Sequence, residues 1–197
     1  SLPGKTLFKG QFSFKGTEFS AMMRIPKDIS YSDETGKINV YMILEDNPSL
    51  EAIGSVQNII LKGGNSTQDI SGPIISFEKE NGLQLRNGDH FEREQQLYLR
   101  LSDPIGINLT GEVGHEILFT NISNDNEIDI THLFIYDENS ITTGRILIYD
   151  LENENLNFQV KAWDNANNPS QKAINLFFVE NTGLTLFNVL NYPNPFK

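Results

Sequence analysis

The segment at residues 158–179, FQVKAWDNANNPSQKAINLFFV, constrains the fold of this chain more than any other. Phe158, Val160 and Ala162 alternate with more polar neighbours, which is the two-residue period of a half-buried β-strand. Residues 164–169 then supply Asp, Asn and Pro, which favour tight turns and interrupt a strand ladder. A second apolar run follows at 174–179. We therefore expect a strand, a turn and a returning strand, as in the closing hairpin of an immunoglobulin-like module.

Other short apolar runs recur along the chain and are separated by turn-forming residues. We expect strands at residues 5–15, 18–25, 37–44 and 53–61, and again at 74–77, 95–101, 115–119, 132–136 and 143–149. The polar stretch QDISGP at 68–73 resembles a linker between these two sets. No window keeps a helical period. The pattern predicts an all-β chain of two tandem immunoglobulin-like β-sandwich modules, a small one at 1–68 and a larger one at 69–181.

The composition excludes several classes of function. The chain has no cysteine, which rules out disulfides, thiolate nucleophiles and cysteine-ligated zinc within it. A formal net charge of −11 disfavours nucleic acid and anionic lipid as partners. No apolar stretch approaches the roughly 18 residues of a membrane span, so we expect no direct membrane insertion. The first residues, SLPGKTLFKG, do not resemble a secretion signal, and we expect any such signal to lie upstream of them.

The residues that could act in catalysis do not form a recognisable constellation. The chain has three histidines, His90, His115 and His132, but no nucleophile elbow of the form G-x-S-x-G. Acidic pairs are inevitable among 26 Asp and Glu residues, but none is flanked by the aromatic clusters of a sugar cleft. We therefore predict no catalytic residues and no enzymatic activity in this chain.

Calcium is the one small ligand that the polar turns suggest. Ca²⁺ binds six to eight oxygen ligands, mostly from Asp, Asn and backbone carbonyls. The candidate ligands are Asp69, Asp103, Asp164, Asn165 and Asn167. They do not form an EF-hand loop, and turn formation by Asp and Asn explains the same residues without any ion. The sequence therefore predicts either no cofactor or a calcium ion at this set.

Trp163 is the only tryptophan in the chain. It lies on the strand face opposite Phe158, Val160 and Ala162. An exposed indole ring can stack on a sugar, so Trp163 is a candidate binding residue. The alternative is a ring buried under a loop or between modules.

Several short motifs, taken in order along the chain, resemble the region that follows the catalytic domain in gingipain-like cysteine peptidases, and in particular the sortase of the type IX secretion system. The matching residues are Ile25-Pro26-Lys27-Asp28-Ile29-Ser30-Tyr31, Gly36-Lys37-Ile38, Gly72-Pro73-Ile74, Asp103-Pro104-Ile105-Gly106-Ile107-Asn108, Gly114-His115-Glu116, Val160-Lys161-Ala162-Trp163-Asp164, Asn167-Asn168, and Asn191-Tyr192-Pro193-Asn194-Pro195-Phe196. Family loops often read D-x-S-G-I-N, whereas Pro104-Ile105 precede Gly106 here.

This resemblance implies a non-catalytic accessory and spacer region of an exported peptidase. The catalytic Cys and His of the family belong to an upstream domain, and residues 182–197 resemble the start of a C-terminal sorting domain. The upstream peptidase domain and the downstream sorting domain would be the partners, at the outer-membrane surface of the bacterium. A surface adhesin or carbohydrate-binding immunoglobulin-like module is the alternative, and an independent hydrolase is a third reading.

The resemblance also implies that the first module begins with strands that precede Ser1. Residues 1–68 are then a truncated sandwich whose open edge would dock on the second module or pair with another chain. The alternative is that four or five strands already close the module. We also expect the apolar tail at 182–197 to pack against the protein rather than to hang free.

Overall fold

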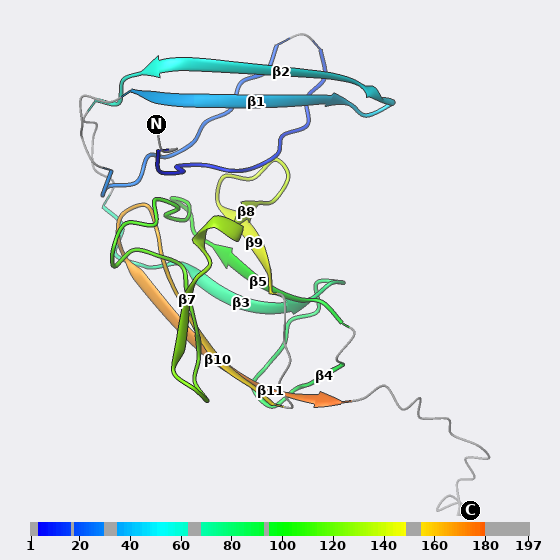
Figure 1. Ribbon diagram of the computed structural model, residues 1–197, viewed down its shortest axis with the longest axis vertical. Helices are drawn as coiled ribbons and strands as arrows, with labels where there is room; N and C mark the ends of the chain where they lie inside the picture. The colour runs from blue at the N-terminus through cyan, green and yellow to red at the C-terminus, as the bar shows by residue number, and fades with distance from the viewer. Residues whose placement is uncertain are drawn as a thin grey trace, which may run out of the picture.

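The computed structural model describes residues 4–16, 18–29, 35–62, 68–92, 95–148 and 155–179 (Figure 1). Its strands are β1 (Gly36–Leu44), β2 (Asn47–Ile59), β3 (Ile74–Lys79), β4 (His90–Glu92), β5 (Leu97–Ser102), β6 (Leu118–Asn121), β7 (Asn126–Asp129), β8 (Ile135–Tyr136), β9 (Thr143–Ile148), β10 (Asn155–Trp163) and β11 (Pro169–Val179). The helical content of these residues is one 3₁₀ turn, η1 (Thr131–Leu133). The prediction of an all-β fold is confirmed.

Residues 74–179 form a two-sheet sandwich. One sheet has five strands in the order β4-β11-β10-β6-β7, and the other has four in the order β3-β5-β9-β8. All neighbours are antiparallel except β11 and β4, which run parallel. Strands that are neighbours in a sheet are thus often distant in sequence, as when β3 pairs with β5 and β5 with β9.

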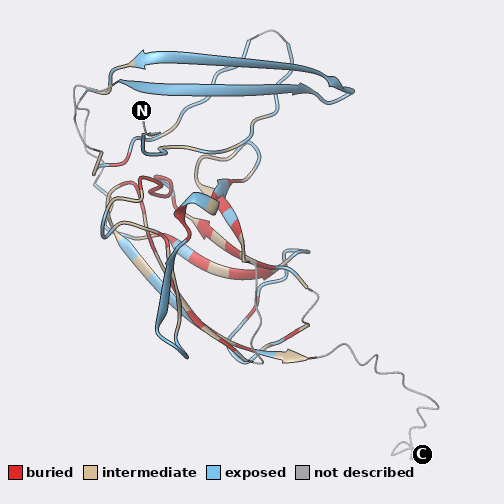
Figure 2. Cartoon of the chain, viewed as in Figure 1, coloured by how far each residue is buried: buried red, intermediate tan, exposed pale blue. Residues whose placement is uncertain are grey.

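The core lies between these sheets and follows the predicted alternation. Leu97, Leu99 and Leu101 of β5 are fully buried, and so are Val160 and Ala162 of β10, while Phe158 is 1% exposed. Phe77 of β3 meets Phe158 edge-on across the sandwich, with ring centroids 5.1 Å apart. Figure 2 shows that the buried residues gather in the sandwich. Burial of these large side chains contributes roughly 1.5–3 kcal/mol each, which explains why the sheets stay together.

The β10–β11 hairpin has the predicted strand–turn–strand form. Its register runs from Asn155 opposite Phe177 to Trp163 opposite Pro169. Pro169 is the first residue of β11, a position where the missing N–H does not weaken the sheet interior. Asn167 has φ of +70° in the turn, the left-handed conformation that asparagine tolerates.

Residues 4–29 contain no β-strand among those described, so the strands expected at 5–15 and 18–25 are wrong. Residues 8–11 of this segment instead lie along β8, one edge of the four-stranded sheet. Tyr136 N–H donates to Lys9 O over 2.9 Å and Asn139 N–H to Gln11 O over 2.8 Å. The Phe8 ring stacks on Tyr136 with centroids 4.8 Å apart. These residues therefore cover a sheet edge that would otherwise be open, although they form no ladder of their own.

Residues 35–62 form a two-stranded sheet, β1 and β2, in place of a sandwich. Every described residue of both strands is exposed, apart from Ile59, which is half-buried (Figure 2). The small sandwich module expected at 1–68 is therefore not confirmed: the described residues show a hairpin where four or five strands were expected. The module boundaries at 68/69 and 181 remain predictions, and the apolar tail at 182–197 lies outside the described residues. Among the described residues, no helix is long and apolar enough to cross a membrane.

Candidate functional site

Two connections meet at the end of the sandwich that faces residues 4–29. One is the β5–β6 connection, with a loop after β5 (103–108) and a loop before β6 (110–116), and the other is the β10–β11 turn (164–168). Asn108 N–H donates to Trp163 O over 2.9 Å, and Asn165 N–H donates to Gly106 O over 3.1 Å. Ile107 and Asp164 also form an isolated antiparallel bridge. These bonds join the loops into one unit, which we call the loop cluster.

Gly106 is required in this unit by its conformation and by its neighbours. Its φ is +88°, in the left-handed region that side chains disfavour. An added Cβ would lie 2.8 Å from Asn165 Nδ2 and 2.9 Å from the Tyr136 hydroxyl. The glycine of the DPIGIN motif therefore permits close contact between the loop and the turn.

The Tyr136 hydroxyl fixes the same loop from β8. It accepts a hydrogen bond from Ile107 N–H over 2.7 Å and lies 3.2 Å from Ile107 O, to which it donates. Burial, with a smaller contribution from Asp103, raises the pKa of Tyr136 to about 12. The phenol is therefore a permanent neutral donor, and its role here is to hold the backbone.

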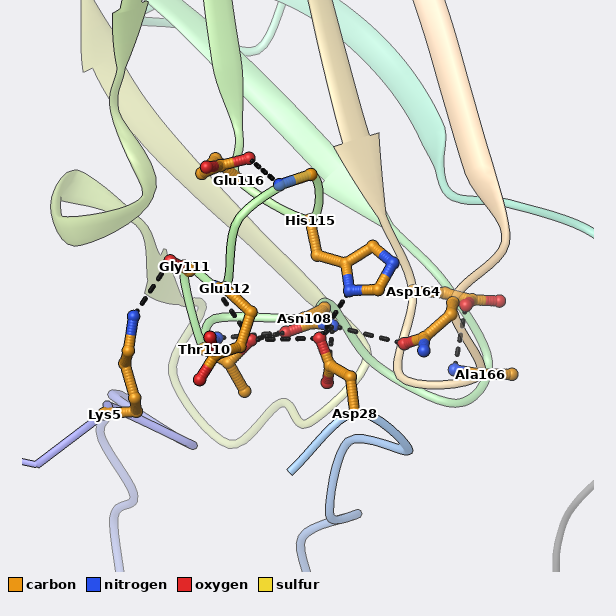
Figure 3. Close-up of polar contacts among 12 residues, drawn as sticks. Lys5, Asp28, Asn108, Thr110, Gly111, Glu112, His115, Glu116, Asp164 and Ala166 are labelled. Atoms are coloured by element: carbon orange, nitrogen blue, oxygen red, sulfur yellow. Dashed lines mark hydrogen bonds and ion pairs between the residues drawn. The ribbon is translucent and has the colours of Figure 1, made fainter. Parts of the chain in front are cut away.

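Asp28 of the N-terminal segment inserts into the loop cluster, as Figure 3 shows. Its Oδ2 lies 2.6 Å from His115 Nδ1, and both of its carboxylate oxygens lie 3.0 Å from Asn108 Nδ2. The Thr110 hydroxyl is 3.3 Å from Asp28 Oδ2 and 2.8 Å from Asn108 Oδ1. The Asp28 side chain is only 10% exposed. A carboxylate held this closely by several donors ties the N-terminal segment to the sandwich.

Two further contacts strengthen the attachment of the N-terminal segment. Lys27 N–H donates to Asn165 O over 2.9 Å, and Pro26 is buried. Lys5 Nζ donates to Gly111 O over 3.0 Å, in the loop before β6. The IPKDI residues are thus anchored by backbone and side chain together.

Trp163 is half-buried and lies between two other side chains. The His115 ring meets it edge-on with centroids 4.6 Å apart, and Lys161 Nζ lies 4.8 Å from the centroid of the indole ring. Its indole Nε1 is buried without a hydrogen-bond partner among the described residues. This environment resembles a packing position under a loop more than an open platform for sugar stacking.

Asp69 converges with Asp103 and Asp164 of the loop cluster, as the calcium prediction requires. One ligand oxygen from each lies within 4.8 Å of the others, and Asp103 and Asp164 are buried. Burial is the main cause that raises the pKa of Asp103 to about 6, and the carboxylates of Asp164 and Asp69 add to it. Three converging carboxylates can share a hard cation such as Ca²⁺, or can be accommodated by protonation of one of them.

These carboxylates also stabilise their own turns. Asp164 Oδ1 accepts from Ala166 N–H and Asn168 N–H, at 2.8 and 2.7 Å. Asp103 Oδ1 accepts from Ile105 N–H over 2.8 Å, and Asp69 Oδ1 accepts from Ser71 N–H over 3.0 Å. The turn-forming role that the sequence offered as an alternative is therefore observed.

The two asparagines of the predicted calcium set make other contacts. Asn165 Nδ2 donates to Ile105 O over 2.8 Å, while its buried Oδ1 has no partner among the described residues. Asn167 Oδ1 lies 3.4 Å from Asn108 Nδ2, on the side of Asp28. The acidic group therefore contains three of the five predicted ligands, and Asn167 belongs to the Asp28 network instead.

The histidines do not form a catalytic arrangement in the described part of the chain. His115 pairs with Asp28, while the His90 ring lies near Phe177 with centroids 6.1 Å apart. The backbone carbonyl of His132 accepts a bond from Lys9 Nζ over 3.4 Å. No serine or threonine hydroxyl among these residues hydrogen-bonds to a histidine ring, so a nucleophile–base pair is not seen.

Asp28 is the residue that sequence reasoning did not single out as part of a site. It stands 80 positions before Asn108 and 87 positions before His115. The available signal was the IPKDI motif itself, which is one of the motifs of the family resemblance. The partners of Asp28 could not be predicted from the neighbouring sequence, because they lie far along the chain.

No protein-family model matches the chain. No curated protein matches it either. Among solved structures, the chain is similar to part of dimeric latent PorU from Porphyromonas gingivalis, with 28% sequence identity and a TM-score of 0.49. The match covers 82% of this chain and 15% of that one, so the chain spans about 15% of the length of that solved protein.

Proposed function

We propose that this chain is a non-catalytic accessory and spacer region of an exported gingipain-like cysteine peptidase, related to the type IX secretion sortase. In this proposal it links an upstream catalytic domain to a downstream sorting domain at the outer-membrane surface. Its role is to support and position the catalytic domain.

The observation that carries this proposal is that the motifs of the family resemblance converge in space. The DPIGIN loop, the GHE loop and the AWDNANN turn form the loop cluster, and the IPKDI segment inserts Asp28 into it (Figure 3). Gly72 of the GPI motif lies against the same turn, where an added Cβ would be 2.3 Å from Pro169 O. Motifs that are separate in sequence thus build one attachment between the segment that leads in and the sandwich.

The chemistry of the attachment supports a mechanical role. Asp28 is occupied by His115 and Asn108, and Tyr136 is held neutral by its raised pKa. A carboxylate that is held by several donors at once, as Asp28 is, is suited to fixing a segment in place. A rigid attachment at this end of the sandwich would hold an upstream domain at a defined distance and orientation.

Two experiments test the proposal. The purified chain, incubated with a mixed peptide library, should show no hydrolysis by mass spectrometry. In the intact parent protein, replacing residues 1–179 with a Gly/Ser linker of equal length should leave cleavage of a short peptide substrate intact. The same replacement should lower the temperature of thermal inactivation and reduce display of client proteins at the cell surface. Hydrolysis by the isolated chain, or unchanged inactivation and display, would contradict the proposal.

The alternative function, a surface adhesin or carbohydrate-binding module, depends on Trp163. A glycan array with the purified chain discriminates the two, since binding that is lost in Trp163→Ala would favour the adhesin. A Tyr98→Ala variant is a suitable control, because Tyr98 is a half-buried aromatic on β5 of the other sheet. We expect no glycan binding, because the His115 ring packs against the half-buried indole ring.

Calcium binding is a second candidate function, favoured by the convergence of Asp69, Asp103 and Asp164. A bound ion would stabilise the junction of linker, loop and turn. The expected result is a rise in melting temperature with millimolar Ca²⁺ over EDTA at pH 7.5, and no rise with Mg²⁺. The rise should disappear in Asp164→Asn but persist in Asp125→Asn, an exposed acidic residue outside the cluster. Equal melting temperatures in Ca²⁺ and EDTA would contradict calcium binding.

A further inference from the structure

The two side chains that bind the Asp28 carboxylate most closely both belong to the sandwich. Asn108 Nδ2 lies 3.0 Å from each carboxylate oxygen, and His115 Nδ1 lies 2.6 Å from Oδ2 (Figure 3). Both come from the β5–β6 connection, and we call this pair the carboxylate site. Asp28 precedes Asn108 by 80 positions, so the carboxylate and its binding site are separate pieces of the chain.

The sandwich itself holds the carboxylate site in shape. Asn108 Oδ1 accepts hydrogen bonds from the Thr110 N–H and hydroxyl, at 3.0 and 2.8 Å, which leaves its Nδ2 to donate to Asp28. Asn108 N–H donates to Trp163 O over 2.9 Å, and the His115 ring packs edge-on against the Trp163 ring. None of these supporting contacts involves residues 4–29. We therefore expect the site to keep its geometry without Asp28, and a preorganised site loses little entropy on binding.

The segment that fills the site is held at three successive residues. Pro26 is buried, Lys27 N–H donates to Asn165 O over 2.9 Å, and the Asp28 carboxylate enters the carboxylate site. The Lys27 side chain is exposed, so only its backbone is recognised. Backbone hydrogen bonds combined with buried alternate side chains are the usual means of binding an extended peptide. The pattern recognised here is Pro-x-Asp, with any side chain in the middle.

The donors also define the charge and the length of the acidic side chain. Among the described residues, Asp28 is contacted by an imidazole, a carboxamide and a hydroxyl, from His115, Asn108 and Thr110. Such a set suits a single carboxylate, whereas a phosphate group is usually bound by arginines. A glutamate would carry its carboxylate one methylene further, and the backbone would have to move away from Asn165 to fit it. The site is therefore specific for aspartate.

We propose that the loop cluster is a peptide-recognition site for a Pro-x-Asp segment, filled in this chain by residues 26–28. A segment of the same chemistry on another protein binds there when residues 26–28 leave. Binding of that partner is thus coupled to release of the N-terminal segment. Recognition requires the loop cluster alone and is independent of the proposed relationship to peptidases.

A titration with the whole chain tests the proposal. The receptor carries Pro26→Gly and Asp28→Gly, which remove the two buried side chains of the bound segment. The ligand is the peptide MRIPKDI, residues 23–29, acetylated and amidated so that it has one carboxylate. Calorimetry should show binding to this receptor and at least about tenfold weaker binding to the wild type, whose tethered segment competes at high effective concentration. Fluorescence of Trp163, the only tryptophan, should change in the same titration, because Trp163 contacts His115.

Matched peptides and receptors show whether the carboxylate is recognised. The peptide with Asn in place of Asp28 should bind about tenfold more weakly, because the charge-assisted hydrogen bond is lost. Adding His115→Ala to the receptor should weaken binding similarly. Adding His90→Ala, at an exposed histidine outside the loop cluster, should leave binding unchanged.

Circular dichroism melts establish that each receptor is folded. If the doubly substituted chain does not fold, Asp28→Ala, which keeps Pro26, is the receptor for the same titrations. A folded receptor that does not bind the peptide would overturn the proposal. Equal binding of the Asp and Asn peptides would overturn it as well, and so would binding that His115→Ala does not weaken.

Discussion

The molecule contains two long β-hairpins, β1–β2 and β10–β11, that look alike in sequence and differ in the folded chain. Both are antiparallel pairs with apolar residues at every second position of the first strand. In β10 the alternating residues Phe158, Val160 and Ala162 are between 0% and 1% exposed. In β1 the corresponding residues Ile38 and Val40 are 44% and 39% exposed.

The difference arises from what lies beside each hairpin. β10 pairs with β6 and β11 pairs with β4, and a second sheet covers one face through contacts such as Phe77 with Phe158. Among the described residues, β1 and β2 pair only with each other. Alternation therefore specifies that a segment forms a strand, but burial depends on partners that other parts of the chain supply.

The largest expected effect is the difference in stability loss between the same substitution, Ile→Ala, in the sandwich and in the β1–β2 hairpin. Ile146→Ala, at a fully buried position of β9, should lower the free energy of unfolding by about 2–5 kcal/mol. Ile53→Ala, at a position of β2 that is 79% exposed, should lower it by under about 0.5 kcal/mol. Urea unfolding of both variants measures the contrast. Similar losses in both would mean that the hairpin face is covered in solution.

A shortened chain tests whether the sandwich is independent of the hairpin. Residues 70–181 alone should unfold in one cooperative transition, because the core strands β3 to β11 are all retained. The free energy of unfolding of this shortened chain should be lower than that of the whole chain by about 1–3 kcal/mol. The reason is that the Phe8–Tyr136 stacking and the Asp28 network are lost. A broad transition seen by circular dichroism would contradict the boundary.

Asp28→Ala tests the attachment of the N-terminal segment at a single residue. It removes the acceptor for His115 and Asn108 and leaves these donors without it, so the free energy of unfolding should fall by about 1–2 kcal/mol. Hydrogen exchange should also speed up at Lys27, whose N–H donates to Asn165 O. Glu80→Ala is the control, since Glu80 is an exposed carboxylate in an ordinary backbone conformation. If the two variants are equally stable, Asp28 does not hold the segment.

The smallest expected effect is a gain in stability, and it depends on pH. In EDTA, the Asp103 pKa of about 6 lies above its ordinary value of 3.8, so the folded state binds a proton more tightly than the unfolded state. This contribution to stability is fully present below about pH 3.8 and is lost as pH rises through about 6.

Asp103→Asn mimics the protonated side chain and should raise the free energy of unfolding at pH 7.5 by about 1 kcal/mol, after discounting for solvent screening. At pH 4 the variant and the wild type should be nearly equal, since the wild-type side chain is then largely protonated. Thermal melts at both pH values measure this difference. A variant that is less stable than the wild type at pH 7.5 in EDTA would contradict the assignment.

The sequence by itself determined the all-β class, the β10–β11 hairpin, and the buried face of β5 at Leu97, Leu99 and Leu101. These features follow from local alternation and turn chemistry, which neighbouring residues fix. It also named three carboxylates that the fold brings together, Asp69, Asp103 and Asp164, because loops at one end of a sandwich lie close in space.

Only the tertiary structure decided the rest. It placed residues 8–11 along the β8 edge without a strand of their own, because hydrogen bonds from Tyr136 and Asn139 fix them and no local period does. It joined Asp28 to His115 across 87 positions, and it moved Asn167 from the calcium set into that network. It also left β1 and β2 as an exposed pair. The physical reason is the same in each case: long-range partners, which local pattern does not encode, determine where a polar group is satisfied and which strand faces are buried.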